Sequence, residues 1–174
     1  NFDIGDSRVV SLDLDEVAKT GGDAADRQTA VMYMIARYVL AKSYYLTEES
    51  IRDMPPAYVE YHKTRIAELR EDPKRIVYDE FHRTSKAEAV RNQVIVDMRE
   101  GRKWKVQVAL ISQSLEDFDE IMVEFATSTY IMDAGPAQTV EKTAKIFGLS
   151  QTGVYALRTR VHGPREGGGT FLAQ

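Results

Sequence analysis

The stretch Arg75-Ile76-Val77-Tyr78-Asp79-Glu80-Phe81 decides the fold, because a short apolar run ends abruptly in two adjacent carboxylates. A short run rich in β-branched residues and flanked by charge is typical of a buried strand. In an open parallel sheet, ligands bind at the carboxyl ends of such strands. We therefore expect Asp79 and Glu80 to lie at a ligand-binding edge of a sheet.

An acidic pair in this place can serve two functions in nucleotide hydrolysis. Asp79 would hold the water shell of a magnesium ion, and Glu80 would orient the attacking water. This is the pattern of a Walker B motif. The alternative is a buried strand followed by an acidic residue that caps the next helix, and the motif alone does not separate the two.

A second buried strand is expected at 106–111, and it ends in the polar triplet Ser112-Gln113-Ser114. A helix-like segment, 86–102, lies between the two strands. A strand, helix and strand in this order form a right-handed crossover, which makes the strands parallel and brings their ends to one edge.

Gln113 would then lie beside the acidic pair. A neutral amide there can sense the γ-phosphate of a nucleotide or hold the attacking water, as Gln does in other nucleotide hydrolases. A loop amide that caps its neighbour is the alternative for Gln113 alone. Together, Asp79, Glu80 and Gln113 favour an ATPase.

Length and composition limit the other classes of function. The 174 residues suffice for a single domain with one core, and the apolar fraction of 43% is that of an ordinary globular protein. The net charge of −4 argues against stable nucleic-acid binding. The absence of Cys excludes disulfides and cysteine metal sites, and the apolar runs are too short to span a bilayer.

Three further elements are expected before the acidic strand. Arg8–Leu14 has the pattern of a buried strand, with Asp13 either at the site edge or capping the next turn. A helix over 24–45 carries an apolar stripe that we expect to pack on the sheet. That stripe consists of Val31, Met34, Ile35, Tyr38 and Tyr45. The pattern of the segment of about 46–73 predicts a helical insertion, in which a helix can begin at Pro56.

Basic residues follow the helix that comes after the acidic strand. Hexameric motors commonly place an arginine finger across the subunit interface, where it stabilises the transferred phosphoryl group. Arg99 and Arg102, near the end of this helix, resemble the basic pair that the motor family described in the next paragraph carries there, and this resemblance makes them the candidates for the role. The alternative is that both cations only interact with the macrodipole at the carboxyl end of the helix.

Several of these segments, taken in order, resemble the motor domain of type IV secretion and conjugation ATPases of the VirB-four class. The segments are Leu12-Asp13-Leu14, a long helix with Tyr33 and Arg37, Ile76–Phe81, Arg99-Glu100-Gly101-Arg102-Lys103, and Ile111-Ser112-Gln113-Ser114. The sequence is most similar to the TraU and DotO (IcmB) branch, and the similarity covers 8–174.

The resemblance implies a RecA-like P-loop core, with a mostly parallel sheet and helices on both faces, that binds ATP and Mg²⁺. It implies a homo-hexamer at the cytoplasmic face of the bacterial inner membrane, which energises the transfer of protein effectors or conjugative DNA. A second secretion ATPase and inner-membrane channel or coupling proteins are the partners it implies.

One part of a P-loop motor is missing from the sequence. No Gly-x-x-x-x-Gly-Lys-[Ser/Thr] occurs, and that loop cradles the phosphates. We therefore expect the chain to be the C-terminal portion of a motor domain, inactive alone. The alternatives are a docking module, through the 56–69 helix or the C-terminal helices, and a DNA pump of the FtsK or HerA kind.

Overall fold

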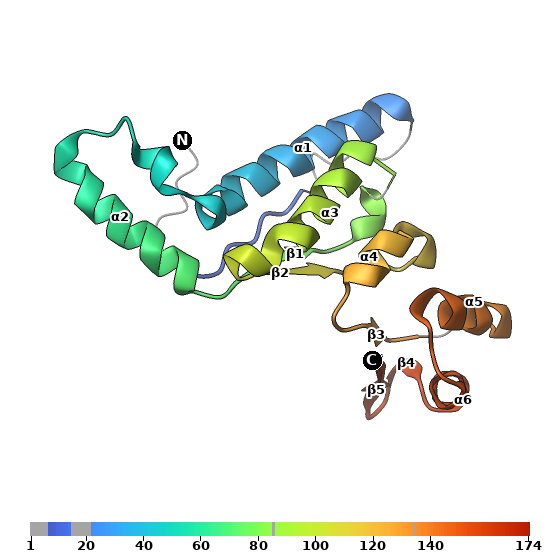
Figure 1. The fold of residues 1–174 in the computed structure, drawn as a ribbon. Helices are drawn as coiled ribbons and strands as arrows, with labels where there is room; N and C mark the ends of the chain where they lie inside the picture. The colour runs from blue at the N-terminus through green and yellow to red at the C-terminus, as the bar shows by residue number, and fades with distance from the viewer. Residues whose placement is uncertain (1–6, 15–21, 85, 134) are drawn as a thin grey trace. The chain divides into compact units, whose positions relative to one another are not determined.

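The structure is a computed structural model that describes residues 7–14, 22–84, 86–133 and 135–174 (Figure 1). The chain divides into two compact units, Asn1–Asp117 and Phe118–Gln174, and each has its own helices and strands.

Unit 1 combines helices with one small sheet. Its elements are α1 (Asp23–Ala41), η1 (Lys42–Tyr45), η2 (Glu48–Ile51), α2 (Pro56–Glu71), β1 (Lys74–Tyr78), η3 (Phe81–Arg83), α3 (Glu88–Gly101), η4 (Arg102–Trp104), β2 (Val106–Leu110) and η5 (Leu115–Asp117). Pro56 stands at the first position of α2, where the missing N–H of proline is not needed.

The two strands of unit 1 are parallel, as the sequence predicts. Their register runs from Lys74 opposite Val106 to Tyr78 opposite Leu110. α3 makes the crossover and turns back at Gly101, where a Cβ atom would collide with the carbonyl oxygen of Val106. Only glycine lets the helix end approach the second strand so closely.

The parallel sheet has one covered face and one open face among the described residues. Tyr78 and Val106 are buried on the side of α3, whereas Val77 on the opposite side is 53% exposed. The α/β class is therefore confirmed. A mostly parallel sheet with helices on both faces is not seen in the described parts of the chain, which contain one parallel pair in unit 1 and two antiparallel pairs in unit 2.

The predicted packing of the apolar stripe on α1 is wrong for three of its residues. Val31, Ile35 and Tyr38 are 57%, 52% and 64% exposed, whereas Thr29, Ala36 and Ala41 are buried on α1, which also contacts α3. Arg37 forms an ion pair with Asp97 of α3. This pair joins α1 to α3, while the larger apolar side chains of the stripe lie on an exposed side of α1.

The buried strand predicted at Arg8–Leu14 is also wrong. The described residues 7–14 form no strand, and Val9 is 89% exposed. A strand is stable when its backbone pairs with a neighbour, and among the described residues β1 and β2 pair only with each other. Asp13 lies in this extended, exposed segment.

Unit 2 is a second, smaller arrangement of short elements. These are α4 (Glu120–Phe125), β3 (Tyr130–Ile131), α5 (Ala137–Phe147), α6 (Gln151–Thr159), β4 (His162–Arg165), β5 (Gly168–Thr170) and β6 (Leu172–Ala173). β3 pairs with β6 and β4 with β5, both antiparallel. Ile131, Val140 and Leu157 form the buried centre of this unit.

Candidate active site

The carboxyl ends of β1 and β2 meet at one edge of the sheet, which places Asp79, Glu80 and Gln113 together. The pairing continues beyond both strands: the N–H of Ile111 donates to the carbonyl of Tyr78 at 3.0 Å, and the N–H of Phe81 donates to the carbonyl of Ile111 at 2.9 Å. The chain between Tyr78 and Phe81 is therefore held at both ends.

Glu80 contacts Gln113 directly across this edge. The side-chain amide of Gln113 donates to both carboxylate oxygens of Glu80, at 3.1 and 3.2 Å. On the other side, His82 Nδ1 lies 3.0 Å from a Glu80 oxygen. The carboxylate is about 41% exposed, so it remains accessible to water or a ligand. A carboxylate held beside an amide and open to solvent has the geometry of a group that can orient water.

The backbone at Glu80 has an uncommon conformation. Its φ of 51° lies in the left-handed region, which costs a residue with a Cβ atom about 1 kcal/mol. Asp79 supports the turn, because its carboxylate accepts a hydrogen bond from the N–H of Glu80 at 2.9 Å. Such strained positions persist where the surrounding structure holds them, and they cluster at functional sites.

Capping of the next helix by the Glu80 side chain, one form of the alternative, is not seen. The short helix η3 begins directly after Glu80, but no side-chain hydrogen bond from Glu80 caps it. The α-helix α3 starts only at Glu88, with Ala87 at its cap position. Glu80 therefore occupies the cap position of η3 at the strand edge without a side-chain capping bond.

Asp79 has the chemical character of a magnesium-shell residue. Magnesium keeps several of its waters and is usually bound by one or two carboxylates together with phosphate oxygens. Within the described ranges, no three His, Asp or Glu residues converge as a direct metal site. A single exposed carboxylate that acts through water, as predicted for Asp79, requires no such cluster.

Arg99 and Arg102 lie at the other end of the sheet. Both are exposed, Arg99 in the last turn of α3 and Arg102 in η4, just before β2 begins at Val106. Glu80 follows the opposite end of the strands, and five residues of strand at ~3.3 Å each separate the two ends. The fold of one subunit thus does not bring these arginines to Glu80.

A buried polar cluster around Asp97 was missed by the sequence analysis. Asp97, on α3, is 1% exposed and accepts hydrogen bonds from residues of four elements. The donors are Arg37 (Nε at 3.0 Å, and Nη2), Tyr45 (3.2 Å), Tyr78 (3.3 Å) and Gln93 (3.1 Å). The signal was an acidic residue within the apolar stripe that also contains Val90 and Val94.

The cluster changes the acid–base character of its members. Burial, followed by the charge of Asp97, raises the pKa of Tyr45 to about 12. The same two causes raise the pKa of Tyr78. Burial opposes the charge of Arg37, but the hydrogen bond and the charge of Asp97 outweigh it, so the pKa of Arg37 is raised. The two phenols therefore remain protonated donors well above neutral pH.

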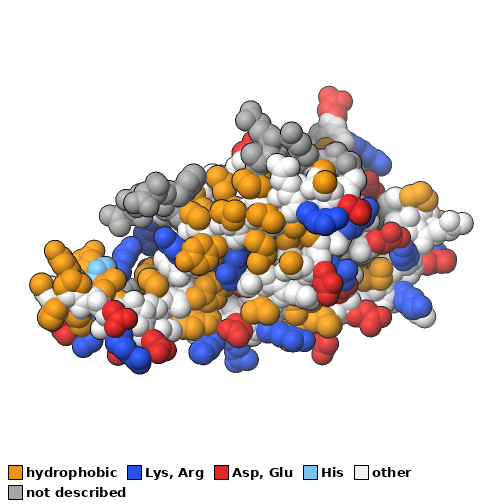
Figure 2. Space-filling model, turned by 90° about the horizontal axis from the view of Figure 1, so that it is seen from above, with side chains coloured by type: hydrophobic (Ala, Val, Ile, Leu, Met, Phe, Trp, Pro, Cys, Tyr) orange, Lys and Arg blue, Asp and Glu red, His pale blue; other side chains and the backbone are white. Residues whose placement is uncertain are grey.

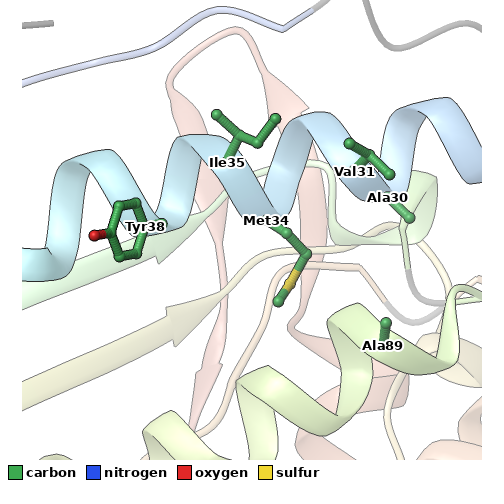
Figure 3. Close-up of a pocket in the computed structure, with 6 residues that line it drawn as sticks. All are labelled: Ala30, Val31, Met34, Ile35, Tyr38 and Ala89. Atoms are coloured by element: carbon green, nitrogen blue, oxygen red, sulfur yellow. The ribbon is translucent and has the colours of Figure 1, made fainter. Parts of the chain in front are cut away.

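An open apolar hollow of ≈ 330 Å³ lies on unit 1, and neither Asp79 nor Glu80 is among the residues that line it. Figure 3 shows the residues that line it, from α1 and α3. They are Ala30, Val31, Met34, Ile35, Tyr38 and Ala89. Figure 2 shows hydrophobic side chains gathered on this side of the molecule. Tyr38 supplies a hydroxyl to this lining, and the other lining side chains are apolar, so the acidic pair remains the candidate active site.

No protein-family model, curated protein or solved structure matches the chain. None of the helices in the described ranges is long and apolar enough to cross a membrane.

Proposed function

We propose that the chain carries the acidic and amide part of an ATP-hydrolysing site, in a RecA-like motor domain of the VirB-four class. The contact between Glu80 and Gln113 across two parallel strands carries this proposal. It brings a carboxylate and an amide, 33 residues apart, to the sheet edge where nucleotide hydrolases place such groups.

Each residue of the site has a separate role in this proposal. Asp79 positions the waters of Mg²⁺, Glu80 activates the attacking water, and Gln113 links the γ-phosphate to the loop that follows β2. The phosphates need a Gly-rich loop with Lys, and the 174 residues contain none. In this proposal, another part of the protein supplies that loop.

The proposals on assembly, location, partners and transported substrate rest on the resemblance to the VirB-four class. The motor would assemble as a homo-hexamer at the cytoplasmic face of the bacterial inner membrane, with a second secretion ATPase and membrane channel proteins as partners. It would energise the transfer of protein effectors or conjugative DNA, and hexamer assembly would bring Arg99 or Arg102 to a neighbouring site.

The deciding experiment is ATP hydrolysis by the full-length protein that contains this chain. Glu80→Gln keeps the shape of the side chain and one of the two oxygens that accept from the Gln113 amide, but removes the base. Turnover should fall by about 10²-fold to 10⁴-fold while ATP binding, measured by calorimetry, is retained. Glu124→Gln, an exposed carboxamide substitution on α4, is the matched control. Turnover within twofold of wild type in Glu80→Gln would exclude Glu80 as the base.

A docking module is the second candidate, and exposed aromatic residues on α2 favour it. Tyr58 and Tyr61 are 59% and 68% exposed. Because tyrosine is a common anchor of protein interfaces, two exposed tyrosines on one helix favour a docking surface. A pull-down with the partner secretion ATPase, with and without ATP, separates the two candidates. Binding that is independent of nucleotide, retained in Glu80→Gln and lost in Tyr58→Ala/Tyr61→Ala would favour docking.

A further inference from the structure

The buried cluster around Asp97 connects four elements of unit 1. Asp97 belongs to α3, Arg37 to α1, Tyr45 to η1 and Tyr78 to β1, and each of the last three donates a hydrogen bond to the Asp97 carboxylate. A carboxylate with negative charge acts only as an acceptor, so these donors match its chemistry.

Stability alone is a weak reason for such a cluster. Removing two charges from water is costly, and well-packed apolar side chains of similar volume often stabilise a fold equally well or better. Asp97 is 1% exposed and its partner Arg37 is 17% exposed, so both charges lose much of their hydration. The place where the cluster meets the strand suggests a different role.

Tyr78 is the member of the cluster that leads to the candidate active site. It is the last residue of β1, it is 6% exposed, and Asp79 and Glu80 follow it directly. Its hydroxyl is held by Asp97 at 3.3 Å, and its carbonyl is held by Ile111 at 3.0 Å. The residue is therefore fixed through both its side chain and its backbone.

The next fixed point lies immediately beyond Glu80. Phe81 is fully buried, and its N–H donates to the carbonyl of Ile111. Two anchors, Tyr78 and Phe81, thus enclose a two-residue turn in which Glu80 has a φ of 51°. A small shift of either anchor would relax this turn and move the carboxylate of Glu80 away from Gln113.

We propose that Asp97, supported by Arg37, is a positioning residue that acts on Glu80 through the Tyr78 hydroxyl. The Asp97 carboxylate fixes the end of β1, and the fixed end holds the left-handed turn that directs Glu80 toward Gln113. This inference rests on the proposed ATPase function. It predicts that loss of the Tyr78 hydroxyl slows the chemical step and leaves nucleotide binding unchanged.

The test compares Tyr78→Phe with Tyr45→Phe in the full-length protein. Both variants remove one phenol hydroxyl from the same carboxylate, but only Tyr78 is joined to Glu80 by the strand end. In Tyr78→Phe, kcat should fall on the order of tenfold to a hundredfold, because a misplaced catalytic group has an effect of this size. KM for ATP should stay within about twofold, and Tyr45→Phe should leave both constants within about twofold.

A double variant shows whether the effect passes through Glu80. Tyr78→Phe added to Glu80→Gln should lower turnover no further, because residues that act through one group are not additive. Asp97→Ala, which removes the acceptor of the Tyr78 hydroxyl, should reproduce the loss of kcat. Circular dichroism gives the folded fraction of each variant, and turnover is expressed per folded molecule.

Two results separate failure of this inference from failure of the proposed function. If Tyr78→Phe and Tyr45→Phe change kcat equally while Glu80→Gln abolishes turnover, the positioning role is refuted and the ATPase proposal stands. If Glu80→Gln itself retains turnover, the ATPase proposal fails, and the positioning role fails with it.

Discussion

The side-chain amide of Gln113 lies 3.1 and 3.2 Å from the two carboxylate oxygens of Glu80, although 33 positions separate the residues in the sequence. The contact exists because both residues follow the carboxyl ends of parallel strands. It joins the loop after β2 to the turn after β1. A ligand that moves one of these loops therefore affects the other.

Replacing Gln113 in the full-length protein should lower ATP turnover in a defined order. Gln113→Leu removes the amide, and we expect a fall of about 10²-fold. Gln113→Glu should be worse, because like charges about 3 Å apart repel and displace the Glu80 carboxylate. The difference in turnover between Gln113→Glu and Gln113→Leu should become smaller as the salt concentration rises from about 0.05 M to about 0.5 M. Salt screens the repulsion because both carboxylates are accessible to solvent.

The salt series contains its own control. Gln113→Leu introduces no charge, so its turnover relative to wild type should stay constant as the salt concentration rises. An equal salt response of the Leu and Glu variants would mean that the contact seen here does not govern the position of Glu80.

Replacing Glu80 by Gly should stabilise the 174-residue chain while removing the proposed base. Glycine adopts a positive φ without strain, and relief of the left-handed conformation should raise the free energy of unfolding by about 1 kcal/mol. Urea denaturation measures the change. Lys105→Gly is the matched control, because Lys105 also has a positive φ, of 53°, but lies at the other end of the sheet.

The two variants together test where the strain is stored. A higher free energy of unfolding in both Glu80→Gly and Lys105→Gly would show that the left-handed backbone is strained at both positions. A loss of stability in Glu80→Gly alone would show that the contacts of Glu80 with Gln113 and His82 outweigh the strain.

The parallel strand pair and its acidic edge could be predicted from the sequence, because their signals are local. The run of β-branched residues before Asp79 defines one strand, and the helix that follows forces a crossover to the next. The positions of Asp79, Glu80 and Gln113 at one edge follow from that topology alone. The contact distances do not, since they depend on the turn at Glu80.

The outward face of α1 and the Asp97 cluster could not be predicted in the same way. Helical periodicity locates an apolar stripe but does not say which neighbour it faces. The ion pair that joins α1 to α3, between Arg37 and Asp97, links residues 60 positions apart in the sequence. The buried state of Asp97 likewise depends on Tyr45 and Tyr78, which only the folded chain brings to it.

Removing the buried carboxylate should strongly destabilise unit 1. In Asp97→Ala, Arg37 and the hydroxyls of Tyr45 and Tyr78 lose their acceptor, and an uncompensated buried charge costs about 3–5 kcal/mol. The free energy of unfolding of the 174-residue chain, from urea denaturation, measures this loss. Asp72→Ala, at the exposed end of α2, is the control and should change stability by less than about 0.5 kcal/mol.

A replacement of the whole pair distinguishes charge from packing. Arg37→Met/Asp97→Leu should recover part of the stability that Asp97→Ala loses, because no charge is then left buried. A double variant as unstable as Asp97→Ala would show that the loss comes from packing and not from an unpaired arginine.

The stability of the chain should fall at alkaline pH because of the buried phenols. Below about pH 10, tyrosine is protonated in both the folded and the unfolded chain, so its contribution to stability is complete. Above this pH the unfolded chain ionises, whereas the pKa of Tyr45 in the folded chain is raised to about 12. The folded state therefore loses stability as the pH rises from about 10 toward 12.

Urea denaturation at a series of pH values, together with tyrosinate absorbance, measures this effect. Tyr45→Phe lacks one of the shifted groups, so its stability should fall less steeply with pH than that of the wild type. Tyr61→Phe is the exposed control, since Tyr61 is 68% exposed. Identical slopes in Tyr45→Phe and the wild type would contradict the assigned burial of this phenol.

The arginines at the far end of the sheet should matter only in an assembled ring. Arg99 and Arg102 lie beyond the amino end of β2, whereas Glu80 follows the carboxyl end of β1, so one subunit cannot bring them together. Arg99→Ala or Arg102→Ala in the full-length protein should leave ATP binding by monomers unchanged. In rings, loss of a finger should lower turnover by about 10³-fold or more, because its fixed charge stabilises the transferred phosphoryl group.

Mixed rings give the most direct test of a finger that acts on a neighbour. Rings assembled from Glu80→Gln subunits and arginine-variant subunits should regain turnover, because some interfaces then combine an intact base with an intact arginine. Arg65→Ala, an exposed arginine on α2, is the matched control. Equal loss of activity in monomers and rings would assign the arginines to the stability of the α3 terminus, where cations interact favourably with the helix dipole.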